Sequence, residues 1–113
     1  MKSLLALLFI VSATIAAAQG VPAIDIAPTC RAAAAGSTGV NQDYDSCRKS
    51  EEAARDILVQ QWNNFLAADR GSCFRLTTTG TPGTYTELLT CLEMKRDARK
   101  LPDGATVGRG LGR

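Results

Sequence analysis

The four cysteines of this short chain constrain its fold more than any other feature. Within 113 residues they stand at Cys30, Cys47, Cys73 and Cys91. An even number of cysteines in a small exported protein usually forms a disulfide framework. Structural zinc sites draw ligands in pairs two to four residues apart, and C-x-x-C redox motifs are equally compact, whereas the separations here are 17, 26 and 18 residues. We therefore predict two structural disulfides and no metal site.

The first 18 residues have the three parts of a secretory signal peptide. Lys2 provides a positive start, residues 4–15 are an apolar run, and Ala16–Ala18 form a small-residue cleavage site. A membrane-spanning helix needs about 20 apolar residues, more than this run provides. We therefore predict cleavage before Gln19 and a periplasmic or secreted protein without a membrane span.

The segment between the second and third cysteines predicts a long helix over residues 46–69. Its apolar positions recur at the helical period and are Ala54, Leu58, Trp62 and Phe65. These side chains are expected in the core, and Gly71 is expected to cap the helix in a left-handed conformation. Such a helix is roughly 36 Å long, which excludes a disulfide between Cys47 and Cys73.

A second helix is predicted from Thr84 to a point before Pro102. Thr84 and Glu87 form a capping box, in which each side chain can accept a hydrogen bond from a backbone N–H. The apolar positions of this helix are Leu88, Cys91, Leu92, Ala98 and Leu101. Basic side chains crowd its last turns, where they suit the helix dipole: Lys95, Arg96, Arg99 and Lys100.

If the two helices fold back as an antiparallel hairpin, Cys91 lies beside the end of the first helix and close to Cys73. Cys30 and Cys47 then remain to join the N-terminal segment to the first helix. This is the pairing we predict, and Cys30–Cys73 with Cys47–Cys91 is the alternative. Each predicted disulfide closes a loop of 18 or 19 residues. The loss of chain entropy in the unfolded state then stabilises the fold by on the order of 3 kcal/mol per disulfide.

The predicted fold is therefore all-α, an antiparallel helical hairpin with a short N-terminal helix, stapled by two disulfides. Residues 19–28 are expected to form an extended arm, and residues 29–101 the four-cysteine helical domain. The short helix lies between Pro28 and a glycine stop at Gly36. Residues 102–113 combine glycines with few apolar groups and are expected to form a disordered tail.

Residues 74–86 are the most unusual segment, with six threonines, two glycines and a proline. We expect a polar loop held at one end by a disulfide. Binding groups are often carried on loops of a rigid scaffold, so this loop is a candidate contact surface, with Arg75, Thr79 and Tyr85 as contact residues. The alternative is a solvated connector.

Two acidic groupings have alternative interpretations. Asn41, Asp43, Asp45 and Glu52 follow the oxygen-ligand spacing of a calcium-binding loop, but Ser46 occupies the position of the turn glycine. We instead expect Asp43 or Asp45 to cap the first helix.

The second grouping is Glu51, Glu52 and Asp56, since paired carboxylates can perform glycosidase chemistry. The simpler interpretation is a set of solvated ion pairs on an exposed helix, because basic residues lie at helical spacing from them: Arg48, Lys49 and Arg55.

The absence of histidine and the low charge exclude several classes of function. Without histidine the chain cannot use serine–histidine or cysteine–histidine catalysis, histidine zinc ligands or imidazole pH switching. A formal net charge of +2 does not provide the field that nucleic-acid binding requires. We expect a protein that is not an enzyme, has no cofactor and does not bind nucleic acid.

The runs QQWNNFLAADRGSC and TYTELLTCLEMKRDARKL resemble small four-cysteine bacterial exported proteins and, more distantly, the N-terminal domain type named after the lysozyme inhibitor LprI. The resemblance covers residues 30–101. The positions that match the motif of the domain type are Gln61, Trp62, Cys73, Cys91, Arg96 or Arg99, and Leu101. The chain departs from it at Asp56-Ile57-Leu58, where an acidic-Leu-Asn stretch is expected.

The resemblance implies a helical periplasmic protein, and more distantly the inhibition of a lysozyme-like hydrolase. Together with the residue patterns, it predicts a non-enzymatic binding protein with a protein partner in the envelope. Residues 74–85 would block a cleft of that partner sterically. The alternative is a structural or accessory envelope protein with no enzyme target.

Overall fold

The computed structural model describes residues 20–36, 39 and 42–102. The expected signal peptide lies outside these residues, as does the expected tail after Pro102. The described part is all-helical, without strands, which confirms the predicted class. Its elements are α1 (Ala27–Ala34), α2 (Tyr44–Gln61), the 3-10 turn η1 (Trp62–Asn64), α3 (Ala67–Thr78) and α4 (Tyr85–Ala98). None of the helices in these ranges is long and apolar enough to cross a bilayer.

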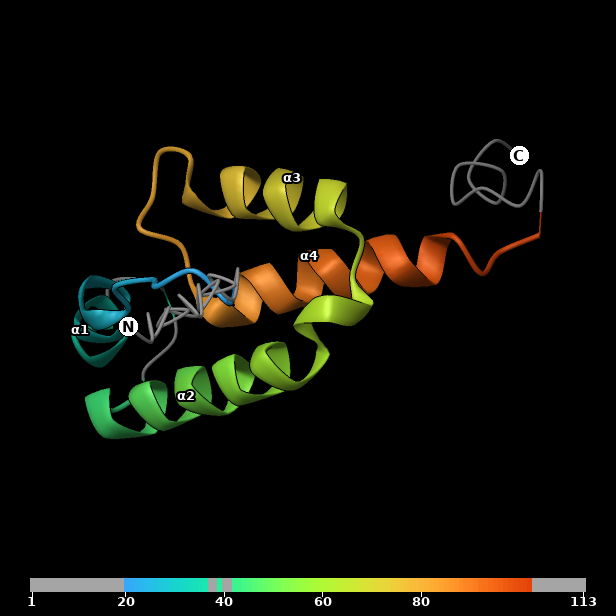
Figure 1. Ribbon diagram of the computed structural model, residues 1–113. Helices are drawn as coiled ribbons and strands as arrows, with labels where there is room; N and C mark the ends of the chain where they lie inside the picture. The colour runs from blue at the N-terminus through green and yellow to red at the C-terminus, as the bar shows by residue number, and fades with distance from the viewer. Residues whose placement is uncertain (1–19, 37–38, 40–41, 103–113) are drawn as a thin grey trace, which may run out of the picture.

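Helix α4 is the centre of the fold, with α2 packed on one side and α3 on the other (Figure 1). Helices α3 and α4 run antiparallel and form a helical hairpin. The prediction is wrong about the partner of α4 in this hairpin, because it paired α4 with the helix over residues 46–69 and did not expect α3. Helices α2 and α4 run in the same direction, because α3 follows α2 in the sequence and returns the chain to the end of the molecule at which α2 began. The arrangement places three buried leucines of α4 in the core: Leu88, Leu89 and Leu92.

Both disulfides have the predicted pairing. Cys30–Cys47 joins α1 to the first turn of α2, with a Cα–Cα distance of 5.4 Å. Cys73–Cys91 joins α3 to α4, with a Cα–Cα distance of 5.7 Å. Each disulfide therefore fixes one pair of neighbouring helices.

The first predicted helix is wrong in its extent. Instead of continuing over residues 46–69, the helix ends at Gln61 and the chain passes through η1 to an extended backbone at Phe65 and Leu66, with ψ angles of 146° and 139°. Asparagine favours caps and turns over helix interiors, and η1 carries two of them in succession. Gly71 is not a cap, because it lies inside α3.

The apolar stripe continues across this break. Trp62 and Phe65 are both buried, as predicted, and they join Leu58 and the α4 leucines in one cluster. The predicted arm contributes as well, since Ile24 is buried in the same cluster and α1 begins at Ala27. Ala98 and Leu101 do not belong to the core, because both are exposed.

The N-terminal ends of α2 and α4 follow the sequence signals. Asp43 caps α2, because its Oδ1 accepts hydrogen bonds from the backbone N–H groups of Asp45 and Ser46 at 2.9 and 3.2 Å. Thr84 caps α4 by accepting from the N–H of Glu87 at 3.0 Å. The acidic residues before α2 thus act as a helix cap, which is the interpretation that the sequence favoured over a calcium loop. Asn41 lies outside the described residues.

Candidate functional site: a groove between α3 and α4

A groove of about 540 Å³ lies between α3 and α4. Five threonines line it, namely Thr77, Thr79, Thr81, Thr86 and Thr90, together with Leu76, Glu87, Cys91 and Met94. We call it the α3–α4 groove. Leu76 on α3 and Met94 on α4 are 69% and 68% exposed. The groove therefore has an exposed apolar side chain on each of its two helices and a lining rich in threonine.

The threonine hydroxyls of the groove all donate hydrogen bonds within the protein. Four of them donate to the backbone carbonyl oxygen four residues earlier: Thr77, Thr79, Thr81 and Thr90. The fifth, Thr86, donates to Glu51 Oε1 at 2.6 Å. Their donor protons are therefore already used, and what remains for a partner is the acceptor capacity of the oxygens and the apolar methyl groups.

The Cys73–Cys91 disulfide lies beneath this surface. Cys73 is fully buried in α3, while Cys91 is partly exposed and lines the groove. The loop from α3 to α4 is also tightly packed: a Cβ atom at Gly83 would lie 2.7 Å from the Thr77 carbonyl oxygen. The disulfide and this loop hold the two walls of the groove at a fixed separation.

The structure separates the three contact residues predicted from the sequence. Thr79 lies in the α3–α4 groove. Arg75 is exposed, but its guanidinium extends back along α3 toward Gly71, where Nη1 would lie 3.5 Å from an added Cβ. Tyr85 is buried, and its hydroxyl accepts a hydrogen bond from the backbone N–H of Ile24 at 2.9 Å. Tyr85 is thus a core residue and not an exposed contact residue.

The predicted loop over residues 74–86 is also corrected. Its first five residues belong to α3, and the threonines at the end of this helix bond back to the preceding turn. Threonine hydroxyls can make this bond because the carbonyl oxygens four residues earlier lie within reach in a helix. The candidate surface is therefore made of two helices and a short turn rather than of a long loop.

Several groove residues were not predicted as contact residues: Leu76 lies inside the predicted segment 74–86, and Glu87, Thr90, Cys91 and Met94 lie outside it. Leu76 is the one large aliphatic residue of the threonine-rich segment, which was a usable signal. No sequence signal indicated Met94, because its position relative to α3 depends on the register of the α3–α4 hairpin.

The acidic grouping of α2 is divided between two environments. Glu51 is buried and accepts hydrogen bonds from the start of α4, so its interpretation as a solvated side chain is wrong. Glu52 forms the expected exposed ion pair with Arg48, one turn away. Within the described ranges, no group of three or more histidine, cysteine, aspartate or glutamate side chains could hold a metal ion.

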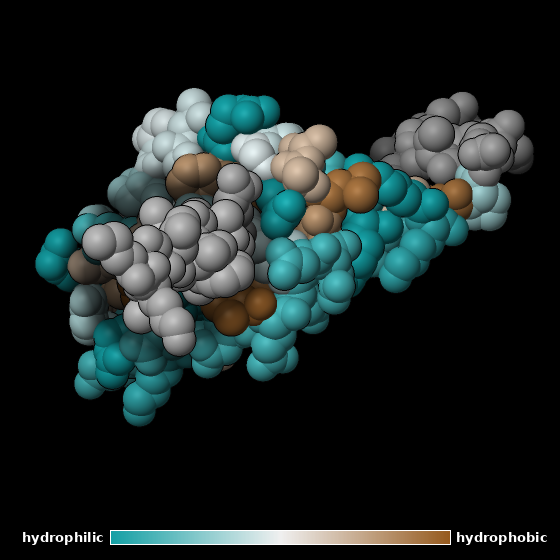
Figure 2. All heavy atoms as spheres, in the orientation of Figure 1, coloured by the Kyte–Doolittle hydropathy of each residue, from teal (hydrophilic) through white to brown (hydrophobic). Residues whose placement is uncertain are grey.

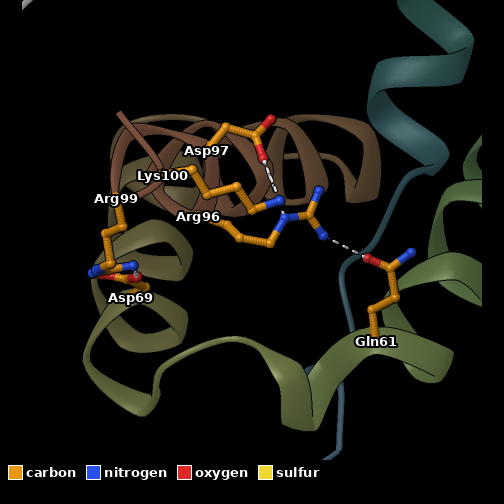
Figure 3. A network of polar contacts seen from close by, with 6 residues as sticks. All are labelled: Gln61, Asp69, Arg96, Asp97, Arg99 and Lys100. Carbon is orange, nitrogen blue, oxygen red and sulfur yellow. Dashed lines mark hydrogen bonds and ion pairs between the residues drawn. The ribbon is translucent and has the colours of Figure 1, made fainter. Parts of the chain in front are cut away.

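A polar network joins the far ends of the helices (Figure 3). Arg99, which follows α4, pairs with Asp69 of α3, and this hydrogen bond lowers the pKa of the Asp69 carboxyl. Arg96 donates to Gln61 Oε1 at 3.0 Å and lies 5.5 Å from the centre of the Phe65 ring. Arg96 and Arg99 therefore tie α2, α3 and α4 together.

The rest of the visible surface is mixed. Figure 2 shows small apolar areas separated by hydrophilic residues on the face turned to the viewer.

Comparison of the chain with protein-family models, curated proteins and solved structures finds no match. The arguments about function therefore depend on the site and on the residue patterns of the sequence.

Proposed function

We propose that this chain is an exported binding protein that uses the α3–α4 groove as its contact surface. The observation that carries the proposal is the pair of exposed side chains, Leu76 and Met94, on the two helices that the Cys73–Cys91 disulfide joins. Rigid surfaces bind with a smaller loss of conformational entropy than flexible ones. A groove with fixed walls and apolar edges suits binding without chemistry.

The site of action we propose is the periplasm or the extracellular space. All four cysteines are paired, with none free, and structural disulfides persist in oxidising compartments. The signal-like residues 1–18 support the same location.

The first partner we propose to test is a lysozyme-like hydrolase of the cell wall. The family resemblance of residues 30–101 favours this class. The mechanism would be steric: the α3–α4 hairpin would cover the edge of the cleft of the enzyme and keep the polymer out.

The test is a titration of the full-length exported protein against a panel of cell-wall hydrolases. We expect dose-dependent inhibition of at least one enzyme. Leu76→Asp should abolish it, because the substitution places a charge where an apolar contact is expected. Val59→Asp on α2 is the matched control, since Val59 is also an exposed aliphatic residue, at 54%, and should leave inhibition unchanged.

Equal inhibition by Leu76→Asp and the unmodified protein would remove the α3–α4 groove as the contact surface. Absence of inhibition at high molar excess over every enzyme would remove the hydrolase partner. In that case a structural or accessory role in the envelope becomes the leading proposal.

A further inference from the structure

The α3–α4 groove offers its partner side chains that accept hydrogen bonds. A carbonyl oxygen can only accept, so the threonines that bond to carbonyl oxygens must be the donors. The same holds for Thr86, whose hydroxyl faces the carboxylate of Glu51 at 2.6 Å. Each of these hydroxyl oxygens still has acceptor capacity directed away from its own bond. A partner that complements this surface must supply donors.

The charge at the groove also favours a partner that supplies hydrogen-bond donors. Glu87, in the first turn of α4, is exposed and lines the groove. Among the described residues that line it, no side chain is cationic. An acidic partner would bring acceptors against acceptors and a negative charge against Glu87, which costs free energy at a desolvated contact.

The apolar component of the partner is set by Leu76 and Met94. Methionine is flexible and polarizable, and it adapts to apolar side chains of different shape. With an aliphatic residue on one helix and a methionine on the other, the groove suits a partner that has one apolar side chain between two hydrogen-bond donors. A neutral sugar has hydroxyl donors, but it has no cation to pair with Glu87 and no aliphatic side chain to lie between Leu76 and Met94.

We propose that the α3–α4 groove binds a basic, apolar segment of a partner protein. A lysine or arginine of that segment pairs with Glu87, its N–H groups donate to the threonine oxygens, and an aliphatic side chain lies between Leu76 and Met94. The inference rests on the proposed function, and it specifies the chemistry of the partner at the same site.

The experiment uses four blocked heptapeptides and the full disulfide-bonded protein with labelled methyl groups. The basic probe is Gly-Lys-Gly-Leu-Gly-Lys-Gly. In the other three, glutamate replaces both lysines, glutamine replaces both lysines, or serine replaces the leucine. Binding is followed by NMR from the methyl shifts of the groove threonines, with the methyl groups of Ile57 on α2 as an internal control.

We expect the basic probe to shift the threonine methyls with saturation and to leave Ile57 unchanged, and the other three probes to bind more weakly. A higher salt concentration should weaken the binding of the basic probe, because dissolved ions screen the attraction between exposed charges. Glu87→Gln should lower its affinity roughly two- to fivefold, as expected for an exposed ion pair. Glu52→Gln, at an exposed glutamate on α2, should not change it.

Equal or stronger binding of the glutamate or glutamine probe would overturn the basic assignment and leave the groove as a binding surface. Unchanged affinity in Glu87→Gln, or no methyl shift with the basic probe, would also overturn it. The proposed function fails by a different measurement, which is unchanged hydrolase inhibition by Leu76→Asp.

Discussion

Glu51, about two turns into α2, accepts a hydrogen bond from the backbone N–H of Tyr85, the first residue of α4, at 2.7 Å. The N–H groups in the first turn of a helix have no partner within the helix and carry its positive dipole end. A buried carboxylate from another helix therefore satisfies donors that would otherwise lose their hydration on folding. It also sets the register of α2 against α4.

This relationship predicts a large difference between two neighbouring glutamates. Glu51→Gln should lower the free energy of unfolding by about 1–3 kcal/mol, because the amide carries no charge and has one acceptor oxygen in place of the two that accept from Tyr85 and Thr86. Glu52→Gln should change it by less than about 1 kcal/mol, since its ion pair with Arg48 is exposed. Urea unfolding followed by circular dichroism measures both. Similar values for the two variants would contradict the tertiary cap.

Gly83 and Gly71 should respond to alanine in opposite directions. Gly83 has a φ of 74°, and an added Cβ would meet the Thr77 carbonyl oxygen. Gly83→Ala should therefore destabilise by at least about 1–2 kcal/mol from the left-handed conformation alone. Gly71 lies inside α3 and has room for a methyl group, so Gly71→Ala should stabilise by up to about 1 kcal/mol. Thermal melts of the two variants provide the check, and a lower melting temperature for Gly71→Ala would contradict this account.

The disulfides should carry much of the net stability. The intact mass of protein purified from the periplasm should match a chain that begins at Gln19, allowing for pyroglutamate, minus four hydrogens. Reduction should remove most of the helical circular dichroism near physiological temperature, because each cross-link contributes on the order of 3 kcal/mol to a small domain. Free thiols in the purified protein, or full helicity under strong reductant, would refute the stapled fold.

Acid should destabilise the protein through two carboxyls. Hydrogen bonds from Ser46 lower the pKa of Asp43, and the bond from Arg99 lowers the pKa of Asp69. A carboxyl with a lowered folded pKa stabilises the fold above the unfolded pKa, about 3.9, and this contribution is lost as pH falls through the folded pKa. Asp43→Ser keeps a capping oxygen without a titrating group, so the decline in melting temperature from pH 5 to pH 2 should be shallower in this variant. Identical slopes would show that the Asp43 cap does not titrate differently in the folded and unfolded states.

Local signals in the sequence were sufficient for the caps at Asp43 and Thr84, which depend on residues within one turn, and the apolar period was sufficient for the buried Trp62 and Phe65. The disulfide pairing is also as predicted, although it was argued from a hairpin in which α2 and not α3 was the partner of α4. The break after Gln61 was missed because the apolar period runs through it unchanged. Helix α3 was missed because threonines and a glycine lower its intrinsic propensity, while its packing against α4 compensates.

The candidate site was less predictable, for a physical reason. Whether Tyr85 faces solvent or the core depends on Ile24, which is 61 residues away. Whether Glu51 is solvated depends on where α4 begins relative to α2. Thr79 is exposed and lines the groove, and its role as a contact residue stays a prediction. The apolar edges of the groove required the register of two helices, which no local pattern specifies.

The order of the disulfides has a consequence for how the chain matures. Cys30 pairs with Cys47, and Cys73 pairs with Cys91, so each cysteine bonds to its immediate neighbour along the sequence. A polypeptide that emerges from a translocation pore N-terminus first exposes the members of each pair consecutively. An oxidase that joins every new thiol to the last one exposed yields the native connectivity directly, and a disulfide isomerase has nothing to correct.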